Sequence, residues 1–258
     1  MHIADPFISP AVGLTMCAVS TAAIVYSVAK VKKDELCEKR VPVIGMMSAL
    51  VFAVQMLNFT IPGTGSSGHI IGGILLAAMI GGYSAMLAMS AVLVVQCLFF
   101  ADGGLLALGC NIFNVGVIPC LIVYPLICKP LMKQGRVAIA SIAAVVIGLQ
   151  LGAFGVVLQT FLSGVAELPF TIFLSSMLPI HLAIGLIEGA ATAAVLYFVM
   201  RPETMESVFV KSGISLKTAF AMLAVITLII GASLSPIASS NPDGLEWAIE
   251  RTAETVKN

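Results

Sequence analysis

Residues 70–100 read IIGGILLAAMIGGYSAMLAMSAVLVVQCLFF, and this stretch decides the fold class. It contains no charged side chain, and it is longer than the roughly 20 apolar residues that cross the hydrocarbon core of a bilayer. The pair Gly81-Gly82 interrupts it. Because adjacent glycines break helices, we expect a short helix over about 70–80 and a longer one over about 83–100.

The composition of the whole chain indicates the same class. Of its 258 residues, 59% are hydrophobic and only 10% are charged, and the mean hydropathy is +1.08. A soluble domain has about a quarter of its residues charged. The formal net charge is zero, so the chain lacks the excess of positive charge that is typical of a nucleic-acid-binding protein. We therefore predict an all-α integral membrane protein surrounded by the lipid bilayer.

Other apolar stretches long enough to span a membrane lie on both sides of residues 70–100. They cover about 11–31, 42–60, 112–131, 137–162, 175–200 and 217–236. With 70–80 and 83–100 they predict a helical bundle of about eight transmembrane helices. The stretch at 11–31 lacks the basic segment with which a signal sequence begins, so we interpret it as an uncleaved helix.

Positive charges test this topology, because cytoplasmic loops are enriched in Lys and Arg. Eleven of the thirteen Lys and Arg residues fall in the connections after the first, fifth and seventh predicted spans. The opposite loops, 62–69, 101–111 and 163–174, contain none. This distribution predicts that both termini are extracytoplasmic, on the same side as these three loops.

The three histidines of the chain, His2, His69 and His181, all fall at that outer side. The α-amine of Met1, the backbone nitrogen of His2 and the Nδ1 atom of His2 can chelate one ion through adjoining rings, and a second imidazole can complete a plane. Four nitrogens in a plane suit Ni(II) or Cu(II), and Co(II) less strictly. A dipeptide of this kind also occurs in unstructured termini, but the convergence of all three histidines favours a metal site.

Several polar residues near this face can hold a ring N–H or offset the charge of the ion. These candidates are Asp5, Ser67, Asp102, Asn111, Asn114 and His181. Each also fits helix capping, turn formation or a hydrogen bond between helices, and both interpretations stay open. Glu188 lies two helical turns after His181, where we expect internal hydrogen bonding rather than metal ligation.

Five motifs carry a resemblance to a known family. They are MHI-x-D-x-F-x-S-P at 1–10, PGTGSSGH-xx-GG at 62–73, QCLFFADGGLLALGCNIFN at 96–114, HLAIGLIEGAAT at 181–192 and PDGLEW at 242–247. Together they resemble the nickel/cobalt substrate-binding component of energy-coupling factor (ECF) transporters. Residues 1–200 resemble its M component, 201–216 would be a cytoplasmic linker, and 217–258 resemble part of the N component with its extracytoplasmic PDGLEW tail.

This resemblance implies that the chain binds Ni(II) or Co(II) as a transported substrate, in a square plane formed by Met1, His2 and His69, without an organic cofactor. It also implies a transmembrane scaffold subunit and two ATPase subunits as partners, in the plasma membrane of a prokaryote. Two features depart from the family. Ala4-Asp5-Pro6 stands where Pro-Asp-Gly is usual, and we expect the N component to be shortened because it normally continues into a second helix.

Energy must come from outside the chain or from a gradient, because no GxxxxGK[ST] motif is present. Gly45, Ala49 and Ala53 form a ridge of small residues that fits close contact with a scaffold helix, or equally packing within the chain. The alternative function is a stand-alone secondary metal transporter, which would need paired intramembrane carboxylates or histidines. We expect no enzymatic activity, since no HExxH motif occurs and four nitrogen ligands leave no position for an activated water.

Overall fold

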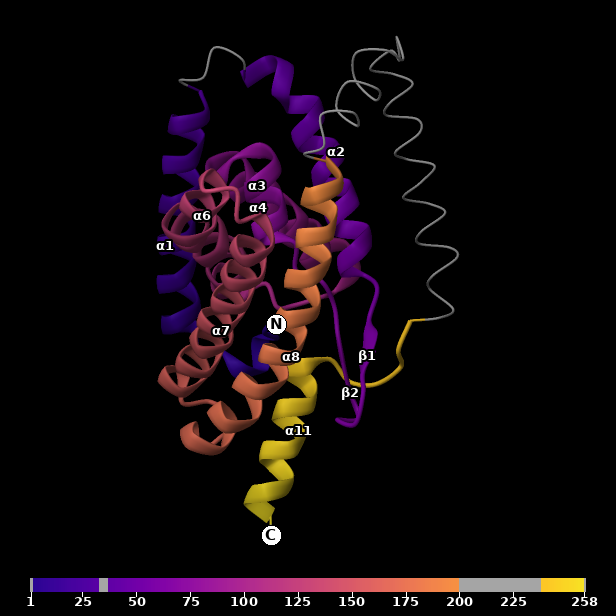
Figure 1. Ribbon diagram of the computed structural model, residues 1–258. Coiled ribbons are helices and arrows are strands. Elements are labelled where there is room, and N and C mark those ends of the chain that lie inside the picture. The colour runs from indigo at the N-terminus through magenta and orange to yellow at the C-terminus, as the bar shows by residue number, and fades with distance from the viewer. Residues whose placement is uncertain (1, 33–36, 200–237, 258) are drawn as a thin grey trace.

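A computed structural model describes residues 2–32, 37–199 and 238–257, and this part of the chain is mostly helical (Figure 1). Its long helices are α1 (Pro10–Val31), α2 (Cys37–Gln55), α4 (Gly82–Phe100), α7 (Val137–Ser163) and α8 (Phe170–Val199). The shorter ones are η1 (Asp5–Phe7), α3 (Gly73–Ile80), α5 (Leu108–Ile112), η2 (Phe113–Cys128), α6 (Lys129–Lys133) and α11 (Gly244–Lys257).

Five helices of the described residues are long and apolar enough to cross a membrane. They cover Pro10–Val31, Gly82–Phe100, Leu108–Lys133, Val137–Ser163 and Phe170–Val199. These five agree with predicted spans. The apolar part of α2, Val43–Gln55, is shorter, and α3 has only 8 residues. The predicted span at 217–236 lies outside the described residues.

A small β-hairpin corrects the all-helical prediction. Strand β1 (Phe59–Ile61) pairs antiparallel with β2 (Ser66–Gly68), with Phe59 opposite Gly68 and Ile61 opposite Ser66. The predicted second span therefore ends early, at Gln55, and the chain leaves α2 to form the hairpin. Gly63 and Gly65 in the turn have φ of 76° and 72°, a conformation that glycine adopts without steric cost.

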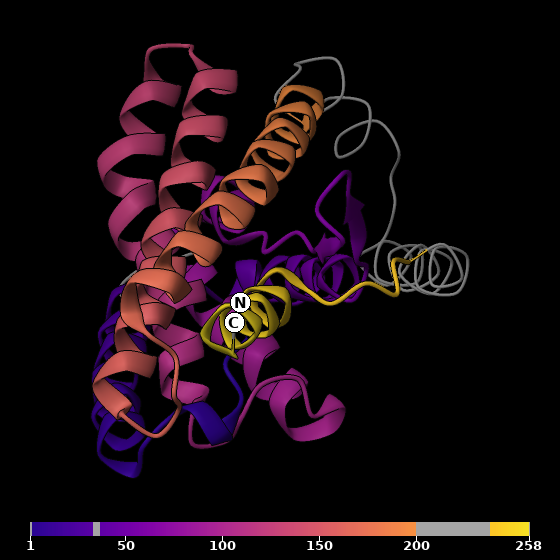
Figure 2. The same ribbon diagram turned by 90° about the horizontal axis from the view of Figure 1, so that it is seen from below.

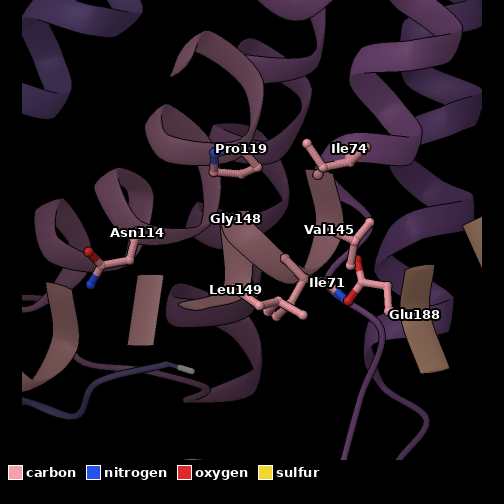
Figure 3. Close-up of a pocket in the computed structure, with 9 residues that line it drawn as sticks. Ile71, Ile74, Asn114, Pro119, Val145, Gly148, Leu149 and Glu188 are labelled. Carbon is pink, nitrogen blue, oxygen red and sulfur yellow. The ribbon is translucent and has the colours of Figure 1, made fainter. Parts of the chain in front are cut away.

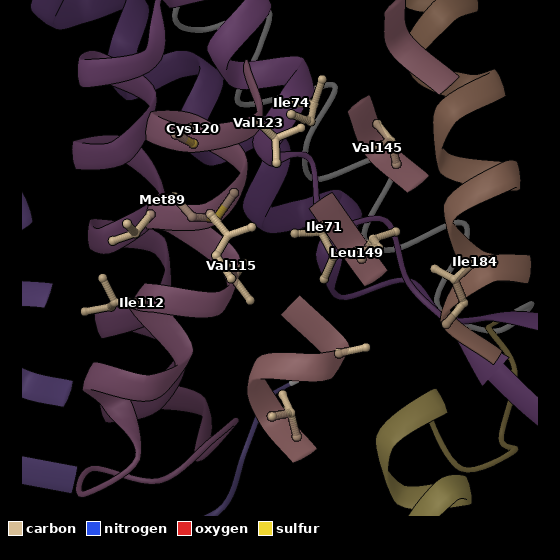
Figure 4. Close-up of a cluster of buried hydrophobic side chains, with 14 of the residues drawn as sticks. Ile71, Ile74, Met89, Ile112, Val115, Cys120, Val123, Val145, Leu149 and Ile184 are labelled. Carbon is tan, nitrogen blue, oxygen red and sulfur yellow. The ribbon is translucent and has the colours of Figure 1, made fainter. Parts of the chain in front are cut away.

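The core lies where η2, α7 and α8 meet α3 and α4 (Figure 4). Its largest fully buried side chains include Phe173 and the methionines Met86, Met89 and Met177. Met fills irregular gaps between helices well because its side chain is unbranched and flexible. Helix η2 has π-type winding and contains Pro119 and Pro125. Proline is tolerated in a membrane helix because neighbouring groups satisfy the freed carbonyls.

The C-terminal segment lies beside the hairpin and α8 (Figures 1 and 2). Ser239 donates its backbone N–H to the carbonyl of Asn58 at 2.8 Å, and Thr60 Oγ1 donates to Ser239 Oγ at 2.9 Å. Helix α11 then packs on α8. The hairpin, the first turn of α11 and the middle of α8 thus meet at one end of the bundle.

Candidate metal site

The N-terminal lead is anchored before α1 begins. Ile3 is buried, with 1% of its surface exposed. Its N–H donates to Asn111 Oδ1 at 2.8 Å, and its carbonyl accepts from Asn111 Nδ2 at 3.1 Å and from the N–H of Gly104 at 2.9 Å. Both backbone groups of Ile3 are therefore held by the 101–111 segment. This sets the position of the adjacent His2.

Glycines in the 101–111 segment make room for this lead. Gly103 has φ of 83°, and a Cβ atom on Gly104 would overlap the Asp5 carboxylate. That carboxylate accepts the N–H groups of Leu105 at 3.2 Å and Ala107 at 3.0 Å. Asp5, which was predicted as a residue near the metal ligands, therefore closes the turn before α5. Its carboxylate contacts backbone amides instead of a histidine.

His2 reaches Asp102 at the end of α4. Its Nδ1 atom lies 2.9 Å from Asp102 Oδ1, and its side chain is 4% exposed against 35% for Asp102. Burial raises the pKa of Asp102, but the hydrogen bond from His2 and the charge of nearby basic groups outweigh burial, so the pKa lies below its usual range. Asp102 is therefore an anion beside His2. The Nε2 atom of His2 is buried and has no hydrogen-bond partner among the described residues.

His69 follows strand β2 and faces His2. The two ring centroids lie 5.5 Å apart and the ring planes differ by 22°. Burial, with a further contribution from nearby positive charge, lowers the pKa of His69 to about 3. The imidazole is therefore neutral, which is the form that binds a metal ion. Its Nε2 atom is also buried without a partner in the described part of the chain.

The PDGLEW segment holds the strand that carries His69. Ser67 donates its backbone N–H to the Pro242 carbonyl at 2.8 Å and its Oγ to the Asn241 carbonyl at 2.8 Å. Ser67 and Asp243 also form a parallel β-bridge. Ser67 was predicted to hold a ring N–H or offset the charge of the ion, and in the structure its side chain joins the hairpin to the C-terminal segment.

Asp243 is a residue of this site that sequence reasoning missed. It begins α11 as the first member of a capping box. Its Oδ1 accepts the N–H of Leu245 at 2.9 Å and of Glu246 at 2.8 Å, and Glu246 Oε2 accepts the N–H of Asp243 at 3.2 Å. Asp243, His69 and His181 line one small cavity. The D-x-x-E spacing of Asp243 and Glu246 in PDGLEW is the sequence pattern that could have predicted this helix start.

Basic groups nearby hold Asp243 in its charged form. Burial raises its pKa, but the positive charge of the nearby N-terminus and the hydrogen bond from the backbone N–H of Glu246 outweigh burial and keep the pKa below its usual range. His181 is 1% exposed, and its Nδ1 donates to the Met177 carbonyl at 2.8 Å. That hydrogen bond leaves the lone pair on Nε2 of His181. The cavity therefore combines two imidazoles and one carboxylate.

The remaining predicted residues lie elsewhere or outside the described residues. Asn114 pairs with Gln159 of α7 through two hydrogen bonds, at 2.8 and 3.1 Å. Gly45 and Ala49 are exposed on α2, whereas Ala53 is buried at 6% exposure, so only part of the small-residue ridge is accessible. Met1 lies outside the described residues.

Side chains alone supply few metal ligands here. Within residues 2–32, 37–199 and 238–257, no group of three or more His, Cys, Asp and Glu side chains is arranged to hold a metal ion. His2 and His69 are the two imidazoles in ring contact at this end of the bundle.

Comparisons with known proteins agree with this architecture. The pattern of the family described as "Cobalt uptake substrate-specific transmembrane region" matches residues 2–205, and that of the "PDGLE domain" matches 217–258. An Archaeoglobus fulgidus protein assigned as a fused nickel transport protein, NikMN, is 33% identical over 237 residues, which cover 88% of this chain and 76% of the relative. The cobalt transport protein CbiM of Geobacter sulfurreducens is 30% identical over 168 residues, which cover 62% of this chain and 47% of the relative.

Solved structures are similar as well. The crystal structure of a transition metal transporter superposes with a TM-score of 0.69 and 25% identity, covering 86% of this chain and 98% of that one. A truncated transition metal transporter gives a TM-score of 0.67 and 28% identity, covering 78% of this chain and 98% of that one. The chain therefore belongs to the family of cobalt uptake substrate-specific transmembrane proteins, as a nickel/cobalt transport component with a PDGLE segment fused behind its M-type region.

Proposed function

We propose that this protein is the substrate-specificity subunit of an ATP-driven ECF-type importer and captures Ni(II) or Co(II) at its extracytoplasmic end. The observation that carries the proposal is the contact between His2 and His69. Their rings are 5.5 Å apart, and the Nε2 atoms of both are buried without partners among the described residues. A buried nitrogen without a partner costs free energy. A cation bound at Nε2 of His69 would remove that cost there, and a hydrogen bond from Nε2 of His2 to Asp102 would remove it at His2.

The ligands of the ion would be the α-amine of Met1, the backbone nitrogen and Nδ1 of His2, and Nε2 of His69. Asp102 accepts a hydrogen bond from Nδ1 of His2 in the structure, so capture through Nδ1 requires the ring to turn. Turning brings the Nε2–H group toward Asp102. A carboxylate that accepts the second ring N–H is the usual way to orient a ligating histidine.

Charge at this end of the bundle suits a dication. An ion of charge +2 bound through one deprotonated backbone nitrogen leaves a net charge of +1, which is unfavourable in an apolar environment. Asp102 is hydrogen-bonded to His2, and Asp243 lines the cavity with His69. Both carboxylates have pKa values below their usual range. They offset the remaining positive charge without serving as ligands.

The rest of the transport system follows the resemblance described above. We place the chain in the plasma membrane of a prokaryote, with eight membrane helices and both termini extracytoplasmic. The cytoplasmic linker at 201–216 would separate the metal-binding part, 1–200, from the N-type part, 217–258. A scaffold subunit would contact the exposed residues Gly45 and Ala49 of α2, and two ATPase subunits would supply the energy.

A blocked N-terminus tests the proposal directly. Two alanines added before Met1 move the α-amine too far from the His2 ring to share a chelate with it, so the purified protein should lose high-affinity nickel binding in a competition titration with a chromophoric chelator. Two alanines added after Asn258 are the matched control and should leave binding unchanged. Stoichiometric nickel retained by the N-terminally extended protein would refute the terminal chelate.

Transport in membrane vesicles tests the energy source. The proposal expects uptake of radioactive nickel only when scaffold and ATPase subunits and ATP are present. Uptake driven by a proton gradient in vesicles that contain this chain alone would establish the secondary transporter instead. Competition between nickel and cobalt on the purified chain then identifies the preferred ion.

A further inference from the structure

The segment that follows His69 is held from two helices by buried polar side chains. Glu188 of α8 accepts the N–H of Ile71 on Oε2 and the N–H of Gly72 on Oε1, both at 2.9 Å. Gln55 of α2 donates its Nε2 to the carbonyl of Ile71 at 2.6 Å. The N–H and C=O of one residue are thus bound by side chains from opposite sides.

Figure 3 shows the Glu188 part of this arrangement, with its carboxylate beside the main chain at Ile71 and next to a small cavity. Glu188 is 2% exposed and Gln55 is 3% exposed. Polar side chains buried inside a membrane protein are expensive, and they are kept for function or pairing. Here both act on the backbone immediately after a predicted metal ligand.

A third side chain extends the contact to the His2 side of the site. Gln96 of α4 donates its Nε2 to Gln55 Oε1 at 2.7 Å. The backbone carbonyl of Gln96 accepts the N–H of Asp102 at 3.2 Å, and Asp102 contacts His2. One chain of hydrogen bonds therefore runs from the residue beside His2 to the residue two positions after His69.

Stability alone does not explain this chain of hydrogen bonds. Gln96 is 0% exposed, and its Oε1 atom has no partner among the described residues. A buried amide oxygen left unpaired lowers stability, and an apolar residue of similar size would avoid that cost. An arrangement that keeps such a group at an energetic cost is typical of a residue retained for its position.

We propose that Gln55 and Glu188 are positioning residues of the metal site, which hold Ile71 so that the His69 imidazole stays in place as the fourth ligand. This inference rests on the proposed function. Because His69 is only two residues before Ile71, a small displacement of Ile71 moves His69 with it. The side chains that orient a metal ligand typically change metal affinity by about 10- to 100-fold when they are replaced.

The test compares two buried amides of the full-length protein. Gln55→Met is close in volume and removes the hydrogen bonds to Ile71 and Gln96. Gln159→Met is the matched control, because Gln159 is also buried (6% exposed) and also bonded to another amide, that of Asn114. We expect Gln55→Met to weaken nickel affinity about 10- to 100-fold, and Gln159→Met to leave it unchanged even where both lower the unfolding temperature equally.

Two further readouts separate positioning from a general loss of stability. The absorption band of bound Cu(II) should shift in Gln55→Met toward that of His69→Ala, because both lose the fourth nitrogen. In the His69→Ala background, Gln55→Met should weaken binding no further, since residues that act as a unit are not additive. Glu188→Gln exchanges one acceptor oxygen for a donor. It should likewise weaken nickel affinity, shift the Cu(II) band and have no further effect in the His69→Ala background. It replaces Gln55→Met in the experiment if that variant does not fold.

Unchanged nickel affinity and an unchanged Cu(II) band in both variants would overturn the inference. An undiminished effect of Gln55→Met in the His69→Ala background would do so as well. Failure of the proposed function is recognisable separately, because the unmodified protein would then not bind nickel or would bind it equally well after His69→Ala.

Discussion

A single methyl group on Gly68 should displace His69. Gly68 ends strand β2 and packs on α8, and a Cβ atom there would lie 2.6 Å from Cγ1 and 2.9 Å from Cδ1 of Ile184. Carbon atoms in contact prefer about 3.5–4.0 Å, so either the strand or Ile184 must shift by about 1 Å. Ile184 is 4% exposed and also borders Gly244 of α11, which leaves its side chain little room to move.

The size of the effect follows from this overlap. Forcing one extra methyl group into a packed core costs about 1–3 kcal/mol. If the strand gives way, His69 moves with it, and the same free energy is lost from metal binding. At 1.4 kcal/mol per factor of ten, Gly68→Ala should weaken nickel affinity about 5- to 150-fold.

Nickel competition titrations on the purified protein measure the change. Gly45→Ala is the control, because no atom lies within 4 Å of the added Cβ, and its affinity should be unchanged. Ile184→Ala removes both clashing atoms, so adding Gly68→Ala to that variant should weaken binding by much less. The reasoning is refuted if Gly68→Ala binds nickel normally, or if its effect is equally large in the Ile184→Ala background.

Three further predictions use the same site. Asp102→Asn removes the charge beside His2 and should weaken nickel binding by about 10-fold, the lower end of the usual range because Asp102 is 35% exposed; equal affinity in a titration at low salt would contradict this. Lowering the pH from 7 to 6 should weaken nickel binding by about 100-fold, since chelation releases one proton from the α-amine, with an ordinary pKa of about 7.7–8.0, and one from the amide. His69 adds nothing to this slope, because burial keeps its pKa at about 3, and a flat profile from pH 8 to 5 would exclude the chelate. Ala49→Trp, at an exposed position of α2, should impair copurification with the scaffold subunit while sparing nickel binding; loss of both would indicate packing within the chain.

Local sequence patterns were sufficient for most of the membrane architecture. An uninterrupted apolar stretch such as 83–100 has few alternatives to a spanning helix, because every backbone group must be hydrogen-bonded inside a bilayer. Gly81-Gly82 also marks the boundary between α3 and α4 in the structure. The hairpin at 59–68 was missed, since its first strand continues the apolar pattern of α2 and its second contains only Ser and Gly.

Two of the residues predicted near the metal ligands have different hydrogen-bond partners in the structure. Asn111 and Asn114 are three residues apart, and both were predicted to lie near the metal ligands. Asn111 binds Ile3 at the N-terminal lead, whereas Asn114 pairs with Gln159 of α7. The helix changes from α to π winding between them, which alters the direction of every later side chain.

The sequence by itself determined that this chain is a membrane bundle with its three histidines at one side, because hydropathy and charge act locally along the chain. Only the tertiary structure decided that His2 meets Asp102 and His69, that Gln55 and Glu188 hold Ile71, and that Asp243 reaches the same cavity. These partners lie between 16 and 117 residues apart in the chain where a hydrogen bond joins them. Contacts over such separations depend on how whole helices pack, and no periodicity within one segment records that packing.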